Sequence, residues 1–472
     1  ILAAQEGHEV SLVDKNHKIE ILKAMQGDEC FYGFGDKTGS LNKRGCEYEM
    51  WNTNNPAPQM ENVKSLYKSV PFFITLREDC VFGLFFDNHY KTYFDMGKEN
   101  ASYYYIGADD GNLDYYMFFG ENMSQVLEGY CSLTGTHELP PLWALGYHQS
   151  RWSYESESRM RETAARLRML GIPCDALYLD IDFMERFKVF TWDREKFPQP
   201  EKMIADLKKQ GFKTVAILDP AVKKEEGYPV YEEGAENGYF LKDKNGEIYY
   251  NKVWAGVSAY PDFSKKSVRD WWGDREGEML DQGLEGILMD MNEPSTFDGL
   301  MPLDVVFDND GSPTSHKEMH NLYGNLMGKA VREGWSRAST KRPFIVTRAC
   351  FAGMQKYSMS WTGDNHSIWV MLRESVAQIC SMGLSGMGFT GADVGGYGSD
   401  CSGELLARWT QLGAFYPYFR NHSSRPTRHQ EPWRFGDETL RICREYIRLR
   451  YRLIPYYYDL FWQMAQTGLP VV

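Results

Sequence analysis

Between Leu142 and Phe419, short apolar segments alternate with longer amphipathic ones, and this alternation restricts the fold more than any other feature of the chain. The expected strands are residues 144–147, 176–181, 214–218, 286–289, 344–347, 357–361, 386–390 and 415–419. The segments between them, such as Glu157–Leu170 and Lys202–Gln210, have helical periodicity. Eight strand–helix repeats of this kind indicate an α/β fold, a parallel (β/α)8 TIM barrel.

Residues 1–135 have a different pattern, in which short β-type runs are separated by turns. Val81–Phe86 is one such run, and the turn-like Arg77-Glu78-Asp79 precedes it. The other runs predicted as strands are residues 9–13, 70–76, 103–106 and 115–119. This pattern predicts an antiparallel β-sandwich domain over residues 1–135, followed by the barrel domain over residues 136–472.

Two connections in the barrel domain are longer than a strand–helix repeat requires. Residues 221–262 follow the third strand, and the run 238–250 within them predicts a small β insertion with a hairpin. Residues 296–318 follow the fourth strand and are rich in Gly, Asp and Pro. The last residues, 468–472, resemble the approach to another strand, so we expect the sequence to be cut from a larger protein.

Carboxylate side chains follow five of the predicted barrel strands. They are Asp180, Asp182, Asp219, Asp290, Asp364 and Asp393. A single Asp at a strand end is usually a helix or loop cap. The C-terminal ends of barrel strands, however, form the face on which active sites lie, so these acids are expected to surround one pocket with Arg348, Trp361 and His422. Negative charge around a pocket suits either a metal ion or a cationic transition state.

The metal alternative depends on Asp180-Ile181-Asp182, which has the DxD spacing of metal-dependent nucleotide-sugar transferases. No phosphate-cradling glycine loop or basic cluster accompanies this motif, and the glycines between positions 33 and 39 are interpreted as a sandwich turn. We therefore expect no metal and no cofactor. Two carboxylates in one pocket can instead cleave a glycoside: one attacks the anomeric carbon, and the other protonates the leaving oxygen and then activates water.

The composition argues against several other classes of protein. The formal charge is -13 and no Lys/Arg-rich run is present, so nucleic acid is not an expected partner and a neutral substrate is compatible. The 13 Trp and 30 Tyr offer flat faces for sugar rings, although a large barrel also buries many aromatic side chains. Nine scattered Cys without a CxxC motif predict free thiols in a reducing compartment. No apolar run reaches the roughly 18 residues of a membrane span.

One segment within the predicted barrel resembles a known family. Gly286-Ile287-Leu288-Met289-Asp290-Met291-Asn292-Glu293-Pro294-Ser295 is similar to the nucleophile signature of glycoside hydrolase family 31, which contains α-glucosidases and α-xylosidases. The resemblance extends from residues 32–36 in the predicted sandwich to residues 468–471. It implies that Asp290 is the catalytic nucleophile and that Asp364, in Ser360-Trp361-Thr362-Gly363-Asp364-Asn365, is the catalytic acid/base.

The resemblance also implies a set of substrate-binding residues. Asp180 and His422 correspond to residues that bind the hydroxyls of the non-reducing sugar, and Arg348 corresponds to an arginine beside the acid/base. The apolar and aromatic wall of the pocket is implied at Trp152, Ile181, Ile217, Trp254, Met291, Trp361 and Tyr397. Ordinary barrel packing is the alternative explanation at positions 217, 291 and 397.

Several positions bear on the branch of the family. Met291 resembles the α-glucosidase branch, whereas α-xylosidases more often have Phe there; Trp152 resembles bacterial α-glucosidases and would favour α-1,6 linkages. Leu288 stands where the family often has Trp, and Asn54 stands where an Asp often reaches the pocket, so both departures bear on the sugar preference. Family members also carry β-sandwich domains after the barrel, and we expect no counterpart of them within residues 1–472.

The leading hypothesis is a retaining, exo-acting α-glycosidase that releases terminal α-linked glucose from oligosaccharides through a covalent intermediate. An α-xylosidase, an α-galactosidase and a transglycosylase are alternatives with the same machinery. A binding protein that has lost catalysis is disfavoured because both Asp290 and Asp364 are present. The expected partner is an oligosaccharide and the expected location is the bacterial cytoplasm, with no membrane contact, whereas assembly into a homo-oligomer stays open.

Overall fold

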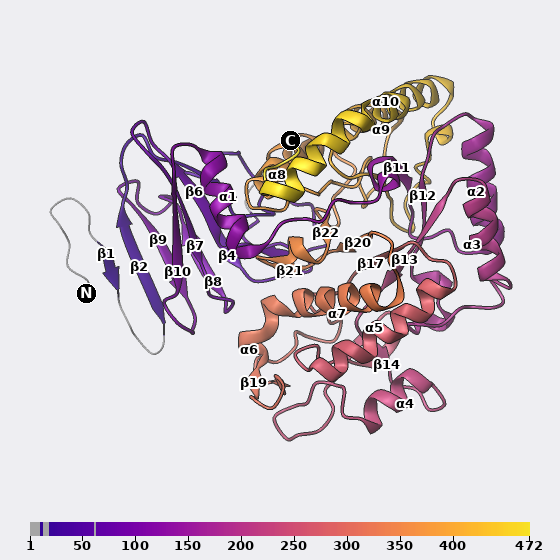
Figure 1. The fold of residues 1–472 in the computed structure, drawn as a ribbon, viewed down its shortest axis with the longest axis horizontal. Helices are drawn as coiled ribbons and strands as arrows, with labels where there is room; N and C mark the ends of the chain where they lie inside the picture. Colours follow the sequence, from indigo (N-terminus) through magenta and orange to yellow (C-terminus); the bar gives the residue numbers. More distant parts are fainter. Residues whose placement is uncertain (1–9, 13–17, 61–62) are drawn as a thin grey trace.

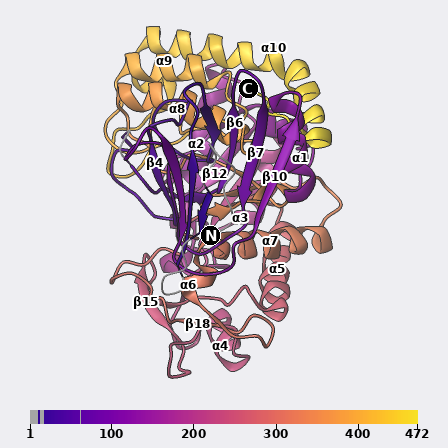
Figure 2. The ribbon, with the colours of Figure 1, turned by 90° about the vertical axis from the view of Figure 1, so that its left-hand side faces the viewer.

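The computed structural model describes residues 10–12, 18–60 and 63–472 and has two parts. A β-sandwich formed by the N-terminal residues lies at one end of a larger barrel (Figure 1). Viewed from the sandwich end, the barrel helices lie behind and above the sandwich strands, and the segments that carry β15, β18 and α4 lie below them (Figure 2).

The N-terminal part consists of two antiparallel sheets, which confirms the predicted sandwich. The first sheet has the order β1 (Val10–Leu12), β2 (Ile19–Ala24), β9 (Tyr103–Ala108), β8 (Thr92–Asp95), β4 (Glu47–Met50). The second has the order β10 (Tyr115–Gly120), β7 (Val81–Phe86), β6 (Phe72–Leu76), β3 (Cys30–Gly33). Alternate residues of the strands point between the sheets, where Phe31, Phe73 and Phe94 are buried in one apolar cluster. Helix α1 (Met123–Thr134) packs on β10 and β7.

The barrel sheet is parallel and curls around the centre of the larger part. Its seven strands have the order β22 (Met359–Ser360), β20 (Ile345–Thr347), β17 (Gly286–Met289), β13 (Lys213–Leu218), β12 (Ala176–Leu179), β11 (Tyr147–Gln149), β23 (Phe419–Asn421). The seventh predicted strand, at 386–390, is not a regular strand. Its backbone nevertheless lies between the two end strands, because Ser360 N donates to Phe389 O at 3.3 Å and Tyr418 N donates to Thr390 O at 2.9 Å.

The irregular backbone of this segment accompanies a close approach to the neighbouring chain at Gly391, which directly follows it. A Cβ at Gly391 would lie 2.1 Å from the carbonyl oxygen of Tyr418, so only glycine permits this approach to the neighbouring chain. Glycine also weakens regular strand structure. The segment therefore closes the barrel, as predicted, without forming a continuous ladder.

Two predicted barrel strands are displaced in the structure. Residues 142–145 form a short 3-10 helix, η1 (Leu142–Leu145), and the first strand begins only at Tyr147. The last strand was expected at 415–419 but runs from Phe419 to Asn421. Pro417 has no N–H group with which to join a sheet ladder, which explains why the strand starts after it.

Helices surround the barrel sheet, and those predicted at 157–170 and 202–210 are confirmed. They are α2 (Glu157–Met169), α3 (Pro200–Lys209), α5 (Lys266–Asp281), α7 (Tyr323–Ala338), α8 (Trp369–Gly383), α9 (Gly403–Gly413) and α10 (Asp437–Thr467). No α-helix lies between β20 and β22. Strand β21 (Cys350–Phe351) lies there instead and pairs in parallel with β5 (Lys68–Ser69), so the fifth repeat joins the barrel to the sandwich part.

The insertion after the third barrel strand is β-rich, as predicted, but its hairpin lies later in the chain than expected. A three-stranded antiparallel sheet contains β14 (Val222–Lys223), β16 (Gly256–Ala259) and β15 (Tyr250–Val253), and α4 (Pro229–Glu236) precedes the hairpin. Within the predicted run 238–250, isolated bridges form, such as that between Lys242 and Ile248, and only its last residue, Tyr250, belongs to a regular strand. The excursion after the fourth strand contains β18 (Val306–Phe307), β19 (Thr314–Ser315) and α6 (His316–Met319).

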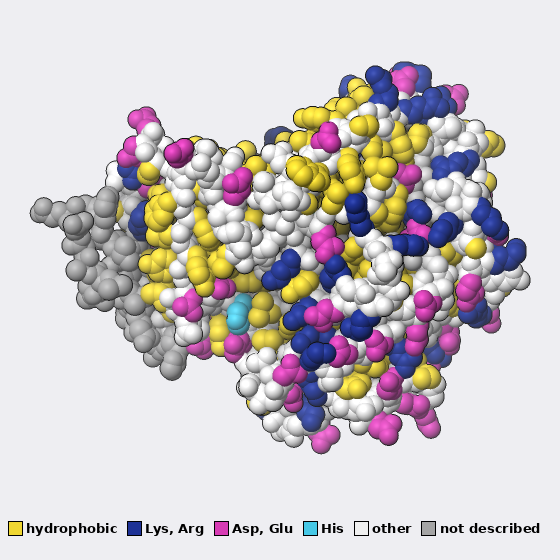
Figure 3. All heavy atoms as spheres, in the orientation of Figure 1, with side chains coloured by type: hydrophobic (Ala, Val, Ile, Leu, Met, Phe, Trp, Pro, Cys, Tyr) yellow, Lys and Arg dark blue, Asp and Glu magenta, His cyan; other side chains and the backbone are white. Residues whose placement is uncertain are grey.

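Short 3-10 helices complete the chain: η2 (Ile181–Phe183), η3 (Glu185–Phe187), η4 (His320–Leu322), η5 (Met354–Lys356) and η6 (Pro432–Arg434). The domain boundary predicted after residue 135 lies between the end of α1 and the start of η1. Acidic and basic side chains are interspersed over the barrel face that Figure 3 shows. Within the described ranges, no helix is both long enough and apolar enough to cross a bilayer.

Candidate active site

A cavity of about 430 Å³ opens at the C-terminal ends of the barrel strands. All twelve residues predicted for the site line it: Asp290, Asp364, Asp180, Arg348, His422, Trp152, Ile181, Ile217, Trp254, Met291, Trp361 and Tyr397. They come from the ends of different strands and from the loops that follow, the arrangement in which barrel enzymes build active sites. Asn54 of the N-terminal part and Leu288 of β17, the two positions that depart from the family pattern, line the same cavity.

Asp290 is the first residue after β17, and a tight turn fixes its direction. The backbone N–H of Met291 donates to Asp290 Oδ1 at 2.7 Å, and Met291 has a φ of 57°. The side chain of Asn292 reaches the next loop, where its Nδ2 donates to Thr347 Oγ1 at 3.0 Å and its Oδ1 accepts from Ala349 N at 3.1 Å. These bonds join the loops after the fourth and fifth strands and keep Asp290 facing the cavity.

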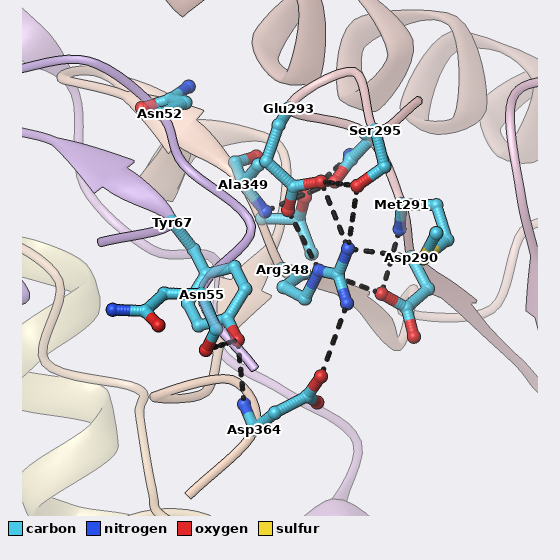
Figure 4. A network of polar contacts seen from close by, with 12 residues as sticks. Asn52, Asn55, Tyr67, Asp290, Met291, Glu293, Ser295, Arg348, Ala349 and Asp364 are labelled. Carbon is cyan, nitrogen blue, oxygen red and sulfur yellow. Dashed lines mark hydrogen bonds and ion pairs between the residues drawn. The ribbon is translucent and has the colours of Figure 1, made fainter. Parts of the chain in front are cut away.

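A single guanidinium group, that of Arg348, connects the two predicted catalytic carboxylates (Figure 4). Its Nε lies 2.9 Å from Asp290 Oδ1, and its Nη1 lies 3.6 Å from Asp364 Oδ2. Glu293 binds the same guanidinium through both oxygens, at 2.8 Å and 2.9 Å. The Arg348 side chain is only 2% exposed, so water screens these contacts little.

The environments of the two carboxyl groups differ. Burial raises the pKa of Asp364 to about 7, against the opposing effect of Arg348 and with the help of the negative charge of Asp290. Burial also raises the pKa of Asp290, but Arg348 and the N–H of Met291 oppose that rise. Because Arg348 lies closer to Asp290 than to Asp364, Asp290 is the member of the pair that ionises first. The pocket can therefore hold one carboxylate beside one carboxylic acid near neutral pH.

Asp180 and His422 form a second polar corner of the cavity. Asp180 Oδ1 accepts from Ile181 N at 2.8 Å, and Asp180 Oδ2 lies 3.9 Å from His422 Nε2. Burial holds the pKa of His422 well below its usual value, so the ring is neutral and the pair carries no full ion-pair attraction. Ser150 Oγ lies 2.7 Å from His422 Nδ1, and Tyr397 stacks on the imidazole with ring centroids 5.1 Å apart. A fixed neutral imidazole beside a carboxyl group suits the recognition of sugar hydroxyls.

Comparison with known proteins identifies the family. The model of the Glycosyl hydrolases family 31 TIM-barrel domain matches residues 137–460, and that of the Glycosyl hydrolase 31 N-terminal galactose mutarotase-like domain matches residues 3–95. The chain belongs to glycoside hydrolase family 31.

Relatives in family 31 match almost the whole chain. Alpha-glucosidase 2 of Bacillus thermoamyloliquefaciens is 48% identical over 453 residues, which are 95% of this chain and 57% of the relative. Neutral alpha-glucosidase C of Homo sapiens is 35% identical, over 95% of this chain and 52% of the relative. The family 31 dextranase of Flavobacterium johnsoniae, complexed with glucose, superposes with a TM-score of 0.92 at 36% identity, over 99% of this chain and 58% of that chain. The chain thus spans about half of the length of the curated relatives that it matches.

Aromatic side chains form one wall of the cavity. The rings of Trp152 and Trp254 lie 5.1 Å apart, and Phe297 packs edge-on against Trp254 at 4.8 Å. Trp254 lies in the turn between β15 and β16, and Phe297 comes from the excursion after β17, where its N–H donates to Lys252 O at 2.9 Å. The predicted site lacked Phe297, because a single aromatic residue in a Gly/Asp/Pro-rich excursion gives no periodic signal.

The strand-end acids were predicted to surround one pocket, and this prediction is confirmed only in part. Asp219 lines the cavity together with Asp180, Asp290 and Asp364, whereas Asp182 and Asp393 are not among the lining residues. Arg420 lies two residues before His422, on a strand whose alternate residues face the same way. It lines the cavity too, and its Nη2 contacts Asp393 Oδ1 at 2.7 Å. Within the described part of the chain, no group of three or more His, Cys, Asp or Glu residues could hold a metal ion.

The buried guanidinium leads to a prediction for stability. Arg348→Met is expected to lower the free energy of unfolding by about 3–5 kcal/mol, because it leaves the buried carboxylates of Glu293 and Asp290 without their cation. Urea unfolding followed by circular dichroism measures the effect. The matched control is Arg194→Met, which breaks an ion pair with Glu201 whose side chains are 56% and 48% exposed, and which should change stability little. Similar unfolding midpoints for the two variants would contradict the prediction.

Proposed function

We propose that the protein is a retaining, exo-acting α-glycosidase that removes terminal α-linked glucose from oligosaccharides. In the first step, Asp290 bonds to the anomeric carbon, the glycosidic C–O bond breaks, and the leaving oxygen takes the proton of Asp364. In the second step, Asp364 removes a proton from water, whose oxygen displaces Asp290 from that carbon. Two displacements at one carbon restore the α configuration.

The proposal rests mainly on one observation: the Arg348 guanidinium contacts both Asp290 and Asp364, and the environments of these two carboxyl groups differ. Asp290 accepts the closer contact from Arg348 and also an N–H bond, both of which favour the anion that a nucleophile requires. Asp364 has a pKa of about 7, which lets it hold a proton for the leaving group and yet release it within the cycle.

The exo mode and the preference for glucose have separate support. A cavity of about 430 Å³ is near the small end of the roughly 300–1,000 Å³ usual for ligand sites, which favours a chain end over the middle of a chain. The named relatives are α-glucosidases, and the similar dextranase was solved with glucose. We also infer that α-1,6 linkages are accepted. Two observations support this inference: the chain is similar to that dextranase, and Trp152 lines the cavity. Relative rates on isomaltose and maltose measure this preference.

Proton NMR of the first product tests the stereochemistry. Hydrolysis of 4-nitrophenyl α-glucoside, which has no free reducing sugar, should release α-glucose before mutarotation produces the β anomer. If β-glucose appears first, a single displacement operates, and the role of Asp290 as nucleophile is wrong. Transfer products at high maltose concentration would instead favour the transglycosylase alternative, since a sugar hydroxyl would then replace water.

The pH dependence follows from the acid/base. As pH rises through about 7, Asp364 loses its proton, so kcat/KM for maltose is expected to fall on the alkaline side of that value. α-Glucosyl fluoride needs no proton on its leaving group, and its kcat/KM should lack this alkaline limb. The pH profiles of the two substrates, measured on the same preparation, check the prediction. An identical alkaline limb for both substrates would show that the limb belongs to another group.

A further inference from the structure

The N-terminal part contacts the loop that carries Asp364 through Tyr67, which directly precedes β5. The N–H of Asp364 donates to the Tyr67 hydroxyl at 3.4 Å, and that hydroxyl donates to Asn55 O at 2.8 Å (Figure 4). Burial raises the pKa of Tyr67 well above its usual value, so the hydroxyl keeps the proton that it donates. Asn55 lies between Asn54 and Pro56, which both line the cavity. One hydroxyl thus connects the acid/base loop to the sandwich loop at the cavity wall.

The ring of Tyr67 contacts the same loop independently of its hydroxyl. Gly363, the residue before Asp364, has a φ of +74°, and a Cβ there would lie 2.2 Å from Tyr67 Cε2. The Arg348 guanidinium also lies against the ring, 5.0 Å from its centroid. Tyr67 is fully buried, so it cannot leave this position without opening the contact between the two parts. The ring therefore restricts both the peptide that carries Asp364 and the cation that binds Asp364.

A second side chain of the N-terminal part, Gln59, binds backbone carbonyl groups of the loop that carries Asp364. Its Nε2 lies 3.3 Å from both Thr362 O and Asp364 O, and the side chain is fully buried. Gln378 of α8 contacts Gln59 Oε1 at 3.5 Å and also donates to Asp36 Oδ1.

Asp36, to which Gln378 donates, belongs to a buried ion pair of the N-terminal part. Lys68 Nζ lies 2.7 Å from Asp36 Oδ2, and neither side chain is exposed. Lys68 follows Tyr67 directly and begins β5, so the ion pair and the tyrosine belong to one rigid segment. Gln59 contacts Gln378, and Gln378 contacts Asp36. Asp36 in turn pairs with Lys68, the residue after Tyr67, so one ion pair supports both Gln59 and the segment of Tyr67.

We propose that Tyr67 and Gln59 are positioning residues that hold the carboxyl of Asp364 at the leaving-group oxygen, so that the N-terminal part controls protonation of the leaving group. The inference rests on the proposed role of Asp364. A side chain with only an architectural role would affect stability, or all substrates equally. A positioning role predicts selective loss with substrates whose leaving group must be protonated, because a displacement of about 1 Å can cost on the order of 100-fold in rate.

The test uses Tyr67→Phe, which keeps the ring against Gly363 and Arg348 and removes only the hydroxyl. We expect kcat/KM for maltose to fall by about 10- to 100-fold, and kcat/KM for α-glucosyl fluoride to stay within about twofold of the parent protein. The matched control is Tyr48→Phe, which removes another buried hydroxyl of the sandwich, bonded to Thr38 O at 3.2 Å. The control should leave the ratio of the two kcat/KM values unchanged.

Gln59→Leu is the second variant and should lower the maltose value selectively in the same way. Equal losses on both substrates, or no loss, in Tyr67→Phe overturn the proposal; if that variant does not fold, Gln59→Leu decides by the same criterion. Asp364→Ala, assayed on the same two substrates, separates this inference from the proposed function. If Asp364→Ala itself shows no selective loss, the acid/base assignment is wrong. If only Asp364→Ala shows it, the assignment stands and the positioning role is wrong.

Discussion

Asp290→Asn is expected to lower kcat for maltose by on the order of 10⁴- to 10⁶-fold, the range found when a covalent nucleophile is removed from other hydrolases. The amide has nearly the shape of the carboxylate, so the contacts of the turn at Met291 can persist. It carries no negative charge, however, and cannot form the glycosyl ester. Initial rates of glucose release, at enzyme concentrations high enough to detect traces of parent protein, measure the loss.

The control for this loss is the same substitution at the opposite end of a barrel strand. Asp175 precedes β12, away from the cavity-lining residues, and Asp175→Asn should leave kcat within about threefold of the parent. The covalent intermediate gives a second measurement. Incubation with 5-fluoro-α-glucosyl fluoride should add one sugar to the mass of the parent protein and none to Asp290→Asn. Parental turnover by Asp290→Asn, or an adduct on it, would show that another residue is the nucleophile.

Asp364→Ala is expected to lower kcat/KM for maltose by about 10²- to 10⁴-fold, the usual contribution of a general acid. The glucose unit that leaves from maltose would depart as an alkoxide unless it is protonated, whereas fluoride leaves without a proton. The kcat/KM for α-glucosyl fluoride, which reports the steps up to formation of the intermediate, should therefore change little. Assays of both substrates on the same protein measure the difference.

Azide distinguishes the roles of the two aspartates. In Asp364→Ala, azide can enter the vacated space and attack the intermediate, and the expected product is the α-glucosyl azide, since the first step has already inverted the carbon once. In Asp290→Ala, azide would instead replace the nucleophile and give the β-glucosyl azide. If the two variants give the opposite pairing of products, the two roles must be exchanged between Asp290 and Asp364.

The relation between the two parts of the molecule affects how these experiments are read. Arg348 contacts both proposed catalytic carboxyl groups and packs against Tyr67, which belongs to the N-terminal part. Strand β5 also pairs with β21 directly after the fifth barrel strand. Substitutions at this contact can therefore alter the pocket without touching substrate. Stability and leaving-group dependence need to be measured together for each variant.

Much of the fold could be predicted from local patterns. Strands β12, β13 and β17 are buried on both faces, so each is an almost uninterrupted run of apolar residues. Such runs are visible in the sequence. The acids after these strands were predicted to converge because parallel strands place their C-terminal ends on one face. Two differences have physical causes that no local pattern contains. The segment at 386–390 is irregular beside Gly391, which approaches Tyr418 closely, and the fifth repeat has no α-helix because strand β5 of the N-terminal part pairs there with β21.

What the sequence determined by itself is the set of twelve site residues that the family resemblance implies, and all twelve line one cavity. Only the tertiary structure decided the contribution of Phe297, Tyr67 and Gln59, which come from an excursion without periodicity and from a different part of the chain. It also decided the unequal distances from Arg348 to Asp290 and Asp364, on which their order of ionisation depends. The physical reason is that strand and helix periods follow from local sterics and burial, whereas charge and contact in a pocket depend on distances between segments far apart in the chain.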